Sequence, residues 1–98
     1  MARFDVYRLA DGSYALDCQA DTLSYLNTRF AVALWPPDEA PVAATRLNPT
    51  FEIEGQPVIM VTQFAAALPI SELRERVTSL SDEHFKIIGA LDFLTGGF

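Results

Sequence analysis

The first part of the chain alternates between apolar and polar residues with the two-residue period of a strand buried on one face. Residues 4–8 alternate in this way, Asp11-Gly12 follows as a turn signal, and residues 14–19 alternate again. The pattern predicts an N-terminal β-hairpin. Since Cys18 shares a face with Leu16, we expect Cys18 to be a buried thiol.

A continuous apolar run occupies the middle of the chain. Residues 30–35 are all apolar, which predicts a central strand that is covered on both faces. Pro36-Pro37 ends this strand, because proline has no N–H to donate to a neighbouring strand. We expect a further short strand at residues 42–47, before a turn at Asn48-Pro49.

A second hairpin is predicted after that turn. Residues 51–54 alternate, Gly55-Gln56 provides a turn, and residues 58–62 return as a strand. Residues 64–68 fit either one more strand or a short turn of helix. Their alanines favour a helix by propensity, but pairing with another strand can override that preference.

Helical signals occur towards the end of the chain. Residues 71–77 start with a serine and an acidic turn, which predicts a short helix. A longer helix is expected from an N-cap at Ser81 through Leu94, ending at Gly96-Gly97.

The longer helix has two apolar faces. Ile87, Leu91 and Leu94 share one face, bordered by Ile88 and Ala90, and this face is expected to pack on the sheet. The opposite face also carries large apolar residues, although it is expected to face solvent.

Phe85, Gly89 and Phe93 lie on roughly the opposite side, at spacings of four residues. Either the helix is covered on both sides within its own domain, or these residues form a surface for a partner or for a second copy of the chain. Phe98 follows two glycines, so it is either disordered or an anchor for a partner.

Length and charge limit the classes of function. A chain of 98 residues predicts a single domain spanning 1–98, and its high apolar content favours a homodimer. The net charge is −6, with only seven Lys and Arg. Direct binding to DNA or to an anionic membrane needs basic surface, so we expect any action at DNA to go through another protein.

Targeting signals are not evident in the sequence. Arg3 and Asp5 interrupt any apolar run at the start, and the longest apolar stretches are far shorter than a membrane span. We therefore expect a cytoplasmic protein. Cys18 is the only cysteine, so no disulfide within the chain is possible.

No motif indicates a catalytic site. His84 is the only histidine, and no nucleophile is placed beside it by any motif. His84 and Cys18 are far apart and do not have the spacing of a zinc site, and no glycine-rich phosphate loop is present. We expect no metal and no cofactor, and a binding protein rather than an enzyme.

Short segments along nearly the whole chain resemble one known family. They include Phe4-Asp5-Val6-Tyr7-Arg8, Asp17-Cys18-Gln19-Ala20-Asp21, Leu26-Asn27-Thr28-Arg29, Arg46-Leu47-Asn48-Pro49, the turn at Gly55, Thr62, Ala66 with Pro69, and the ending from Ala90 to Phe98. In order and spacing these segments resemble the CcdB toxins.

The resemblance implies a mainly β fold, namely an SH3-like β-barrel with a C-terminal α-helix, as in the CcdB and MazF toxins. It implies a homodimer with these helices near the two-fold axis. It also implies binding to the A subunit of DNA gyrase, which is trapped on cleaved DNA. A CcdA-type antitoxin would neutralise the toxin and repress the operon together with it, so DNA is reached only through gyrase or the antitoxin.

The resemblance also implies sites. The last three residues of the family are essential for gyrase poisoning, and they correspond to Gly96, Gly97 and Phe98. The plasmid-borne pattern ends Trp-Gly-Ile, so Gly96 stands where a tryptophan would stack on a gyrase arginine. Phe98 or Phe93 is a candidate aromatic substitute. The antitoxin groove maps to the first hairpin loop, at Asp11, Gly12, Ser13 and Tyr14.

Two alternatives stay open at this stage. One is a MazF-like endoribonuclease on the same barrel, using Arg46 or Arg29 with Asp17. The other is a non-toxic homologue that retains antitoxin binding and autoregulation, which the glycine at position 96 favours.

Overall fold

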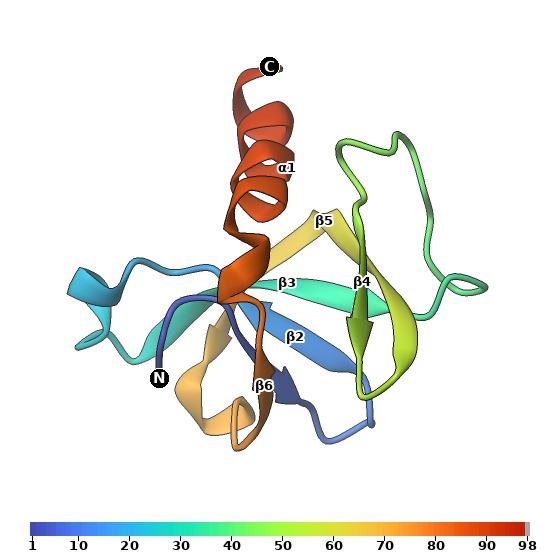
Figure 1. The fold of residues 1–98 in the computed structure, drawn as a ribbon. Helices are drawn as coiled ribbons and strands as arrows, with labels where there is room; N and C mark the ends of the chain where they lie inside the picture. The colour runs from blue at the N-terminus through green and yellow to red at the C-terminus, as the bar shows by residue number, and fades with distance from the viewer. Residues whose placement is uncertain (98) are drawn as a thin grey trace.

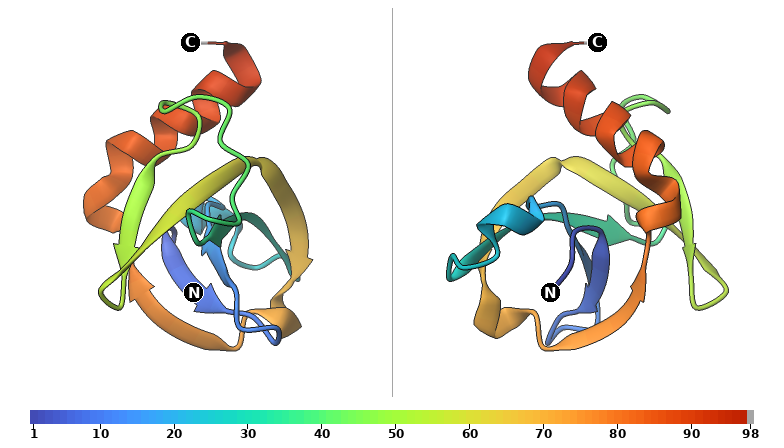
Figure 2. Two further views of the ribbon diagram at one scale, coloured as in Figure 1. Left: turned by 90° about the vertical axis from the view of Figure 1, so that its right-hand side faces the viewer. Right: turned by 60° about the vertical axis from the view of Figure 1, so that its left-hand side comes forward.

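The computed structural model describes residues 1–97, which form one curled antiparallel sheet and a helix (Figure 1). The strand order is β4-β5-β3-β2-β1-β6, and the sheet closes into a nearly complete barrel (Figure 2). The elements are β1 (Asp5–Arg8), β2 (Tyr14–Asp17), β3 (Thr28–Trp35), β4 (Thr50–Ile53), β5 (Gln56–Pro69), β6 (Glu75–Ser79) and α1 (His84–Gly96), with 3-10 turns η1 (Asp21–Leu23), η2 (Ile70–Glu72) and η3 (Ser81–Glu83). The expected mainly β fold, an SH3-like barrel with a C-terminal helix, is confirmed.

Both predicted hairpins are present. In the first, Val6 lies opposite Leu16, and Cys18 is a buried free thiol as expected. In the second, Ile53 pairs with Gln56, so the turn is Glu54-Gly55, one residue earlier than expected. Both turn residues have positive φ, at 53° and 80°, which is the conformation of the tight turns that match strand twist.

β5 is long because residues 64–68 continue it as a strand, which settles the choice that the sequence left open. Val61 lies opposite Ala33 of β3, and Ala66 lies opposite Ala31. Residues 62–65 of β5 therefore lie opposite a single residue of β3, Val32. This bulge bends β5 and turns the sheet into a barrel, as Figure 2 shows.

Two expectations for the middle of the chain are wrong. β3 begins at Thr28, and Phe30 is 41% exposed, so this strand is not covered on both faces along its whole length. Residues 42–47 form a loop rather than a strand. The buried side chain of Asn48 holds this loop, because Oδ1 accepts the Ala43 N–H at 2.8 Å and Nδ2 donates to the Met60 carbonyl at 3.0 Å.

The short helix expected at residues 71–77 is also wrong. The segment forms η2 and then β6, which pairs with β1. Pairing overrides the local helical preference here, and it is supported by burial of Leu73 and by a 3.2 Å ion pair between Arg76 and Asp5.

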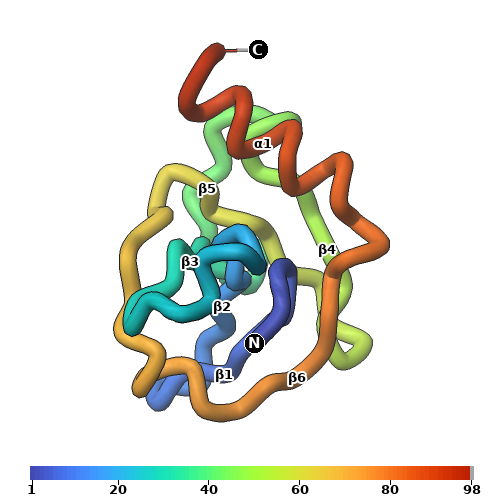
Figure 3. The backbone as a smooth tube through the Cα atoms, turned by 90° about the vertical axis from the view of Figure 1, so that its left-hand side faces the viewer, coloured from blue at the N-terminus to red at the C-terminus, as the bar shows by residue number. Residues whose placement is uncertain are grey.

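α1 begins at His84, and Ser81 lies in η3 without a side-chain cap, so the expected N-cap at Ser81 is wrong. The predicted glycine end is confirmed. Gly97 is left-handed, and its N–H donates to the Phe93 carbonyl at 3.0 Å. The helix continues past the barrel, so its last turn projects away from the sheet (Figures 1 and 3).

The inner face of α1 agrees with the prediction over its first turns only. Ile87 and Ala90 are fully buried, while Ile88 and Leu91 are partly buried against the same core. Leu94 is 43% exposed, which contradicts its assignment to the packed face. The helix leaves the barrel before this residue could reach it.

Candidate functional site

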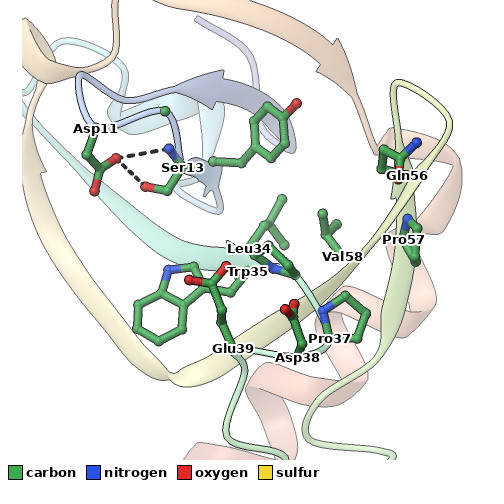
Figure 4. Close-up of a pocket in the computed structure, with 13 residues that line it drawn as sticks. Asp11, Ser13, Leu34, Trp35, Pro37, Asp38, Glu39, Gln56, Pro57 and Val58 are labelled. Carbon is green, nitrogen blue, oxygen red and sulfur yellow. Dashed lines mark hydrogen bonds between the residues drawn. The ribbon is translucent and has the colours of Figure 1, made fainter.

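A hollow of about 770 Å³ lies at one end of the barrel, where the β1–β2 turn, the end of β3 and the start of β5 meet (Figure 4). All four residues predicted to bind antitoxin line it: Asp11, Gly12, Ser13 and Tyr14. The structure thus brings the hairpin loop together with two segments that sequence reasoning did not connect to it.

The floor of this hollow is apolar. It is formed by the buried side chains of Leu34 and Val58 and by the half-buried ring of Trp35. The Trp35 ring is packed edge to face against Phe64, with centroids 5.3 Å apart. A rigid aromatic floor of this kind suits an apolar side chain of a partner.

The rim of the hollow is acidic. Asp11, Asp38 and Glu39 line it, and no Lys, Arg or His is among its lining residues. The Asp11 carboxylate accepts the hydroxyl of Ser13 at 2.6 Å and its backbone N–H at 2.9 Å. These hydrogen bonds lower the pKa of Asp11, so it is charged at neutral pH.

Polar side chains join three strands beside the hollow. The Tyr14 hydroxyl donates to Glu54 at 2.6 Å, and Arg8 forms ion pairs with Glu54 at 2.7 Å and with Glu75 at 3.0 Å. Arg8 also lies over the Tyr14 ring, 5.1 Å from its centroid. Hereafter we refer to Arg8, Tyr14, Glu54 and Glu75 as the clasp, because they connect β1 and β2 to the β4–β5 turn and to β6.

The tip of α1 is the second predicted site. Leu94, Thr95, Gly96 and Gly97 are exposed at the end of the helix. The Thr95 hydroxyl donates to the Leu91 carbonyl at 2.9 Å, which is a bond within the helix. Phe98, the third residue of the predicted gyrase-binding tail, lies outside the described residues.

The third predicted surface lies beside the loop that precedes β4. Phe85 is 88% exposed, and Gly89 and Phe93 are half-buried. Phe93 is partly covered within the chain, because the guanidinium of Arg46 lies 5.3 Å from its ring centroid. Phe85 is not covered, so packing within the chain accounts for only part of this face.

Comparison with protein families adds the deciding observation. The family model described as CcdB protein matches residues 3–97. The chain belongs to the CcdB family. It is accordingly the toxin of a toxin–antitoxin pair, as the resemblance in the sequence implied. A search of curated proteins found no match.

In this CcdB-family chain, the residue pair Arg29 and Asp17, considered above for ribonuclease chemistry, is not accessible to a substrate. Arg29 and Asp17 are fully buried, and Arg29 Nη2 lies 2.7 Å from Asp17 Oδ2. An RNA phosphate cannot reach either group, so the pair holds the fold rather than a substrate. Arg46 is exposed, with its guanidinium stacked on Phe93.

Cys18 and His84, the other residues considered for a reactive role, are held in structural contacts. Burial raises the pKa of the Cys18 thiol to about 12, so it stays protonated. The His84 ring packs edge to face against Phe4 and Phe85.

Within residues 1–97 no cluster of His, Cys, Asp or Glu is arranged to hold a metal ion, and no described helix is long and apolar enough to span a membrane.

One exposed apolar segment, within residues 21–28, was not singled out by the sequence reasoning. Leu23, Tyr25 and Leu26 are exposed there, Tyr25 by 79%. Exposed Ile70 lies nearby, since its N–H donates to the Asn27 carbonyl at 3.0 Å. Large apolar residues within a loop were the available signal for a contact surface.

Proposed function

We propose that this CcdB-family toxin binds the A subunit of DNA gyrase and traps the enzyme on cleaved DNA. It acts in the cytoplasm as a homodimer of single-domain chains, without catalysing a reaction. It holds one conformation of gyrase by binding that conformation more tightly than the others. DNA is reached only through gyrase or the antitoxin.

The observation that carries this proposal is the exposed tip of α1. Leu94 to Gly97 extend beyond the barrel, so a partner can contact them without disturbing the core. The left-handed Gly97 sets the direction of the chain after the helix. The proposed gyrase contact is formed by Gly96, Gly97 and Phe98.

The proposal is tested by incubating the purified protein with gyrase, supercoiled DNA and ATP. Trapping of the cleaved complex yields linear DNA after the protein is denatured. We expect linear DNA to increase with toxin concentration. Absence of linear DNA at saturating concentrations of folded protein would refute gyrase poisoning by this chain.

For neutralisation, we propose that a CcdA-type antitoxin binds the hollow at Asp11, Gly12, Ser13 and Tyr14 and represses the operon together with the toxin. The apolar floor and the acidic rim support this, since they offer both an anchor site and a charge for a partner segment.

A non-toxic homologue is the second candidate function, and Gly96 favours it. Glycine offers no ring to stack on a gyrase arginine, a contact worth about 1–2 kcal/mol where it exists. Overexpression separates the two candidates. Growth arrest that a co-expressed antitoxin relieves supports the toxin, and unchanged growth with tight antitoxin binding supports the homologue.

A further inference from the structure

A second hollow, of about 470 Å³, lies between α1 and the loop that precedes β4. Both elements rise from the same side of the barrel (Figure 1). The lining residues are Thr45, Arg46, Pro49, Thr50, Phe85, Lys86 and Gly89, and we call this the basic hollow.

The charge of the basic hollow is opposite to that of the molecule. The chain carries −6 overall, yet two of its seven Lys and Arg line this hollow, and no carboxylate of residues 1–97 does. Arg46 has no ion-pair partner within residues 1–97. Lys86 lies 3.4 Å from Glu83, but its side chain is largely exposed.

The basic hollow also offers apolar contact. The Phe85 ring is almost entirely in solvent, so its burial against a partner is favourable. The space in front of Gly89 is open, since a Cβ placed there would meet nothing within 4 Å. Phenylalanine and arginine are both enriched at protein interfaces relative to the rest of the surface.

A second copy of the same face is a poor occupant. A two-fold interface centred on this face would set Arg46 and Lys86 of one chain against Arg46 and Lys86 of the other. Like charges facing each other across an interface are unfavourable. Charge complementarity therefore favours a carboxylate-bearing partner.

We propose that the basic hollow binds an acidic segment of a partner protein. Carboxylates of that segment contact Arg46 and Lys86, and an apolar side chain packs on Phe85. The inference goes beyond the proposed function, because it uses neither the tail that contacts gyrase nor the acidic hollow assigned to the antitoxin.

The test uses a short synthetic peptide of Glu, Ser and Gly with one central Phe and an uncharged dye, titrated with the full-length protein and followed by fluorescence anisotropy. The acidic peptide is expected to bind about tenfold more tightly than the same peptide with Gln in place of Glu. Arg46→Gln is expected to weaken binding about threefold, and Phe85→Ser about tenfold.

Two matched controls distinguish binding at this site from non-specific electrostatic or hydrophobic binding of the peptide. Arg74→Gln removes an exposed charge elsewhere, and Tyr25→Ser removes another exposed ring, so both are expected to leave binding unchanged. Equal binding of the acidic and neutral peptides, or equal loss in Arg74→Gln and Arg46→Gln, would overturn the proposal. So would dissociation of a dimer caused by Phe85→Ser, because the face would then be a contact between copies. Gyrase trapping is measured separately and bears on the proposed function alone.

Discussion

The ion pair of Asp17 and Arg29 lies wholly inside the protein, where an unpaired charge is costly. Arg29 Nε donates to Asp17 Oδ2 at 2.9 Å, and Asp17 Oδ1 accepts the Gln19 N–H at 3.0 Å. The pair joins the end of β2 to the start of β3 at the base of the loop that contains η1. The pair therefore holds the two ends of that loop together.

Arg29→Met is expected to lower the free energy of unfolding by about 3–5 kcal/mol, because it leaves the buried carboxylate of Asp17 without its partner. Urea unfolding measures the loss. The double variant Asp17→Asn with Arg29→Met is expected to lose less than the sum of the two single variants. Strict additivity would show that the two side chains are not coupled.

Glu54 makes stability depend on pH in a defined direction. Hydrogen bonds from Tyr14 and then Arg8 lower its pKa in the folded protein. A carboxylate with a lowered pKa stabilises the fold above its ordinary pKa, and this contribution disappears as the pH falls through the folded value. The same hydrogen bond to Glu54 raises the pKa of Tyr14.

Glu54→Gln is therefore expected to reduce the loss of stability that occurs as the pH falls below the ordinary pKa of a glutamate and through the lowered pKa of Glu54. The urea midpoint is measured between neutral and acidic pH. Glu52→Gln is the matched control, since Glu52 is an exposed carboxylate of β4 outside the clasp. Identical pH profiles for the two variants would show that the contacts of Glu54 with Tyr14 and Arg8 do not contribute to stability.

At the scale of elements, α1 is fixed to the barrel by its first turns and free at its tip. Ile87 is fully buried, whereas Leu94, two turns later, is 43% exposed. This difference lets one helix serve both as part of the core and as a projecting contact surface.

Ile87→Ala is expected to lower the free energy of unfolding by about 2–5 kcal/mol, through lost burial and a cavity. Leu94→Ala is the control and should change stability by less than about 0.5 kcal/mol, as exposed substitutions do. Thermal and urea unfolding of both variants compare the two. A similar loss for both would mean that the tip of α1 is packed in solution.

Elements that depend on local signals could be predicted from the sequence, and those that depend on distant partners could not. Turn residues such as Gly12 and Gly55 marked both hairpins, and Gly97 marked the end of α1. β6 was missed because its strand state comes from pairing with β1, about seventy residues earlier.

The candidate sites follow the same rule. The hairpin loop was found through the family resemblance, but its acidic partners Asp38 and Glu39 join it only in the folded chain. The clasp was not predicted because Arg8 and Glu54 are 46 positions apart. The only functional role considered for Arg46 from the sequence was in ribonuclease chemistry, and its position beside Phe93 came from the structure.

At the scale of the whole molecule, two hollows on the surface are lined by charged residues of opposite sign. The hollow at the hairpin loop is acidic, and the basic hollow lies beside α1. A partner segment can therefore be directed to one hollow or the other by its charge, and its binding should weaken as salt screens these contacts.

Trp35 is the only tryptophan in the chain, and it forms part of the floor of the acidic hollow. Binding of the antitoxin there is expected to change the intrinsic fluorescence of Trp35, because the ring leaves contact with water. Asp38→Asn with Glu39→Gln should weaken this response, and Glu72→Gln should not. Tight antitoxin binding without any change in fluorescence would place the antitoxin elsewhere.

The central claim is that the exposed end of α1, together with the last residues of the chain, binds gyrase without catalysing a reaction. Its most direct test is calorimetric titration of the purified A subunit of DNA gyrase with the full chain and with a variant lacking residues 96–98. We expect saturable binding by the full chain and none by the truncated chain, with melting temperatures that agree closely. Equal binding by both chains would contradict the account.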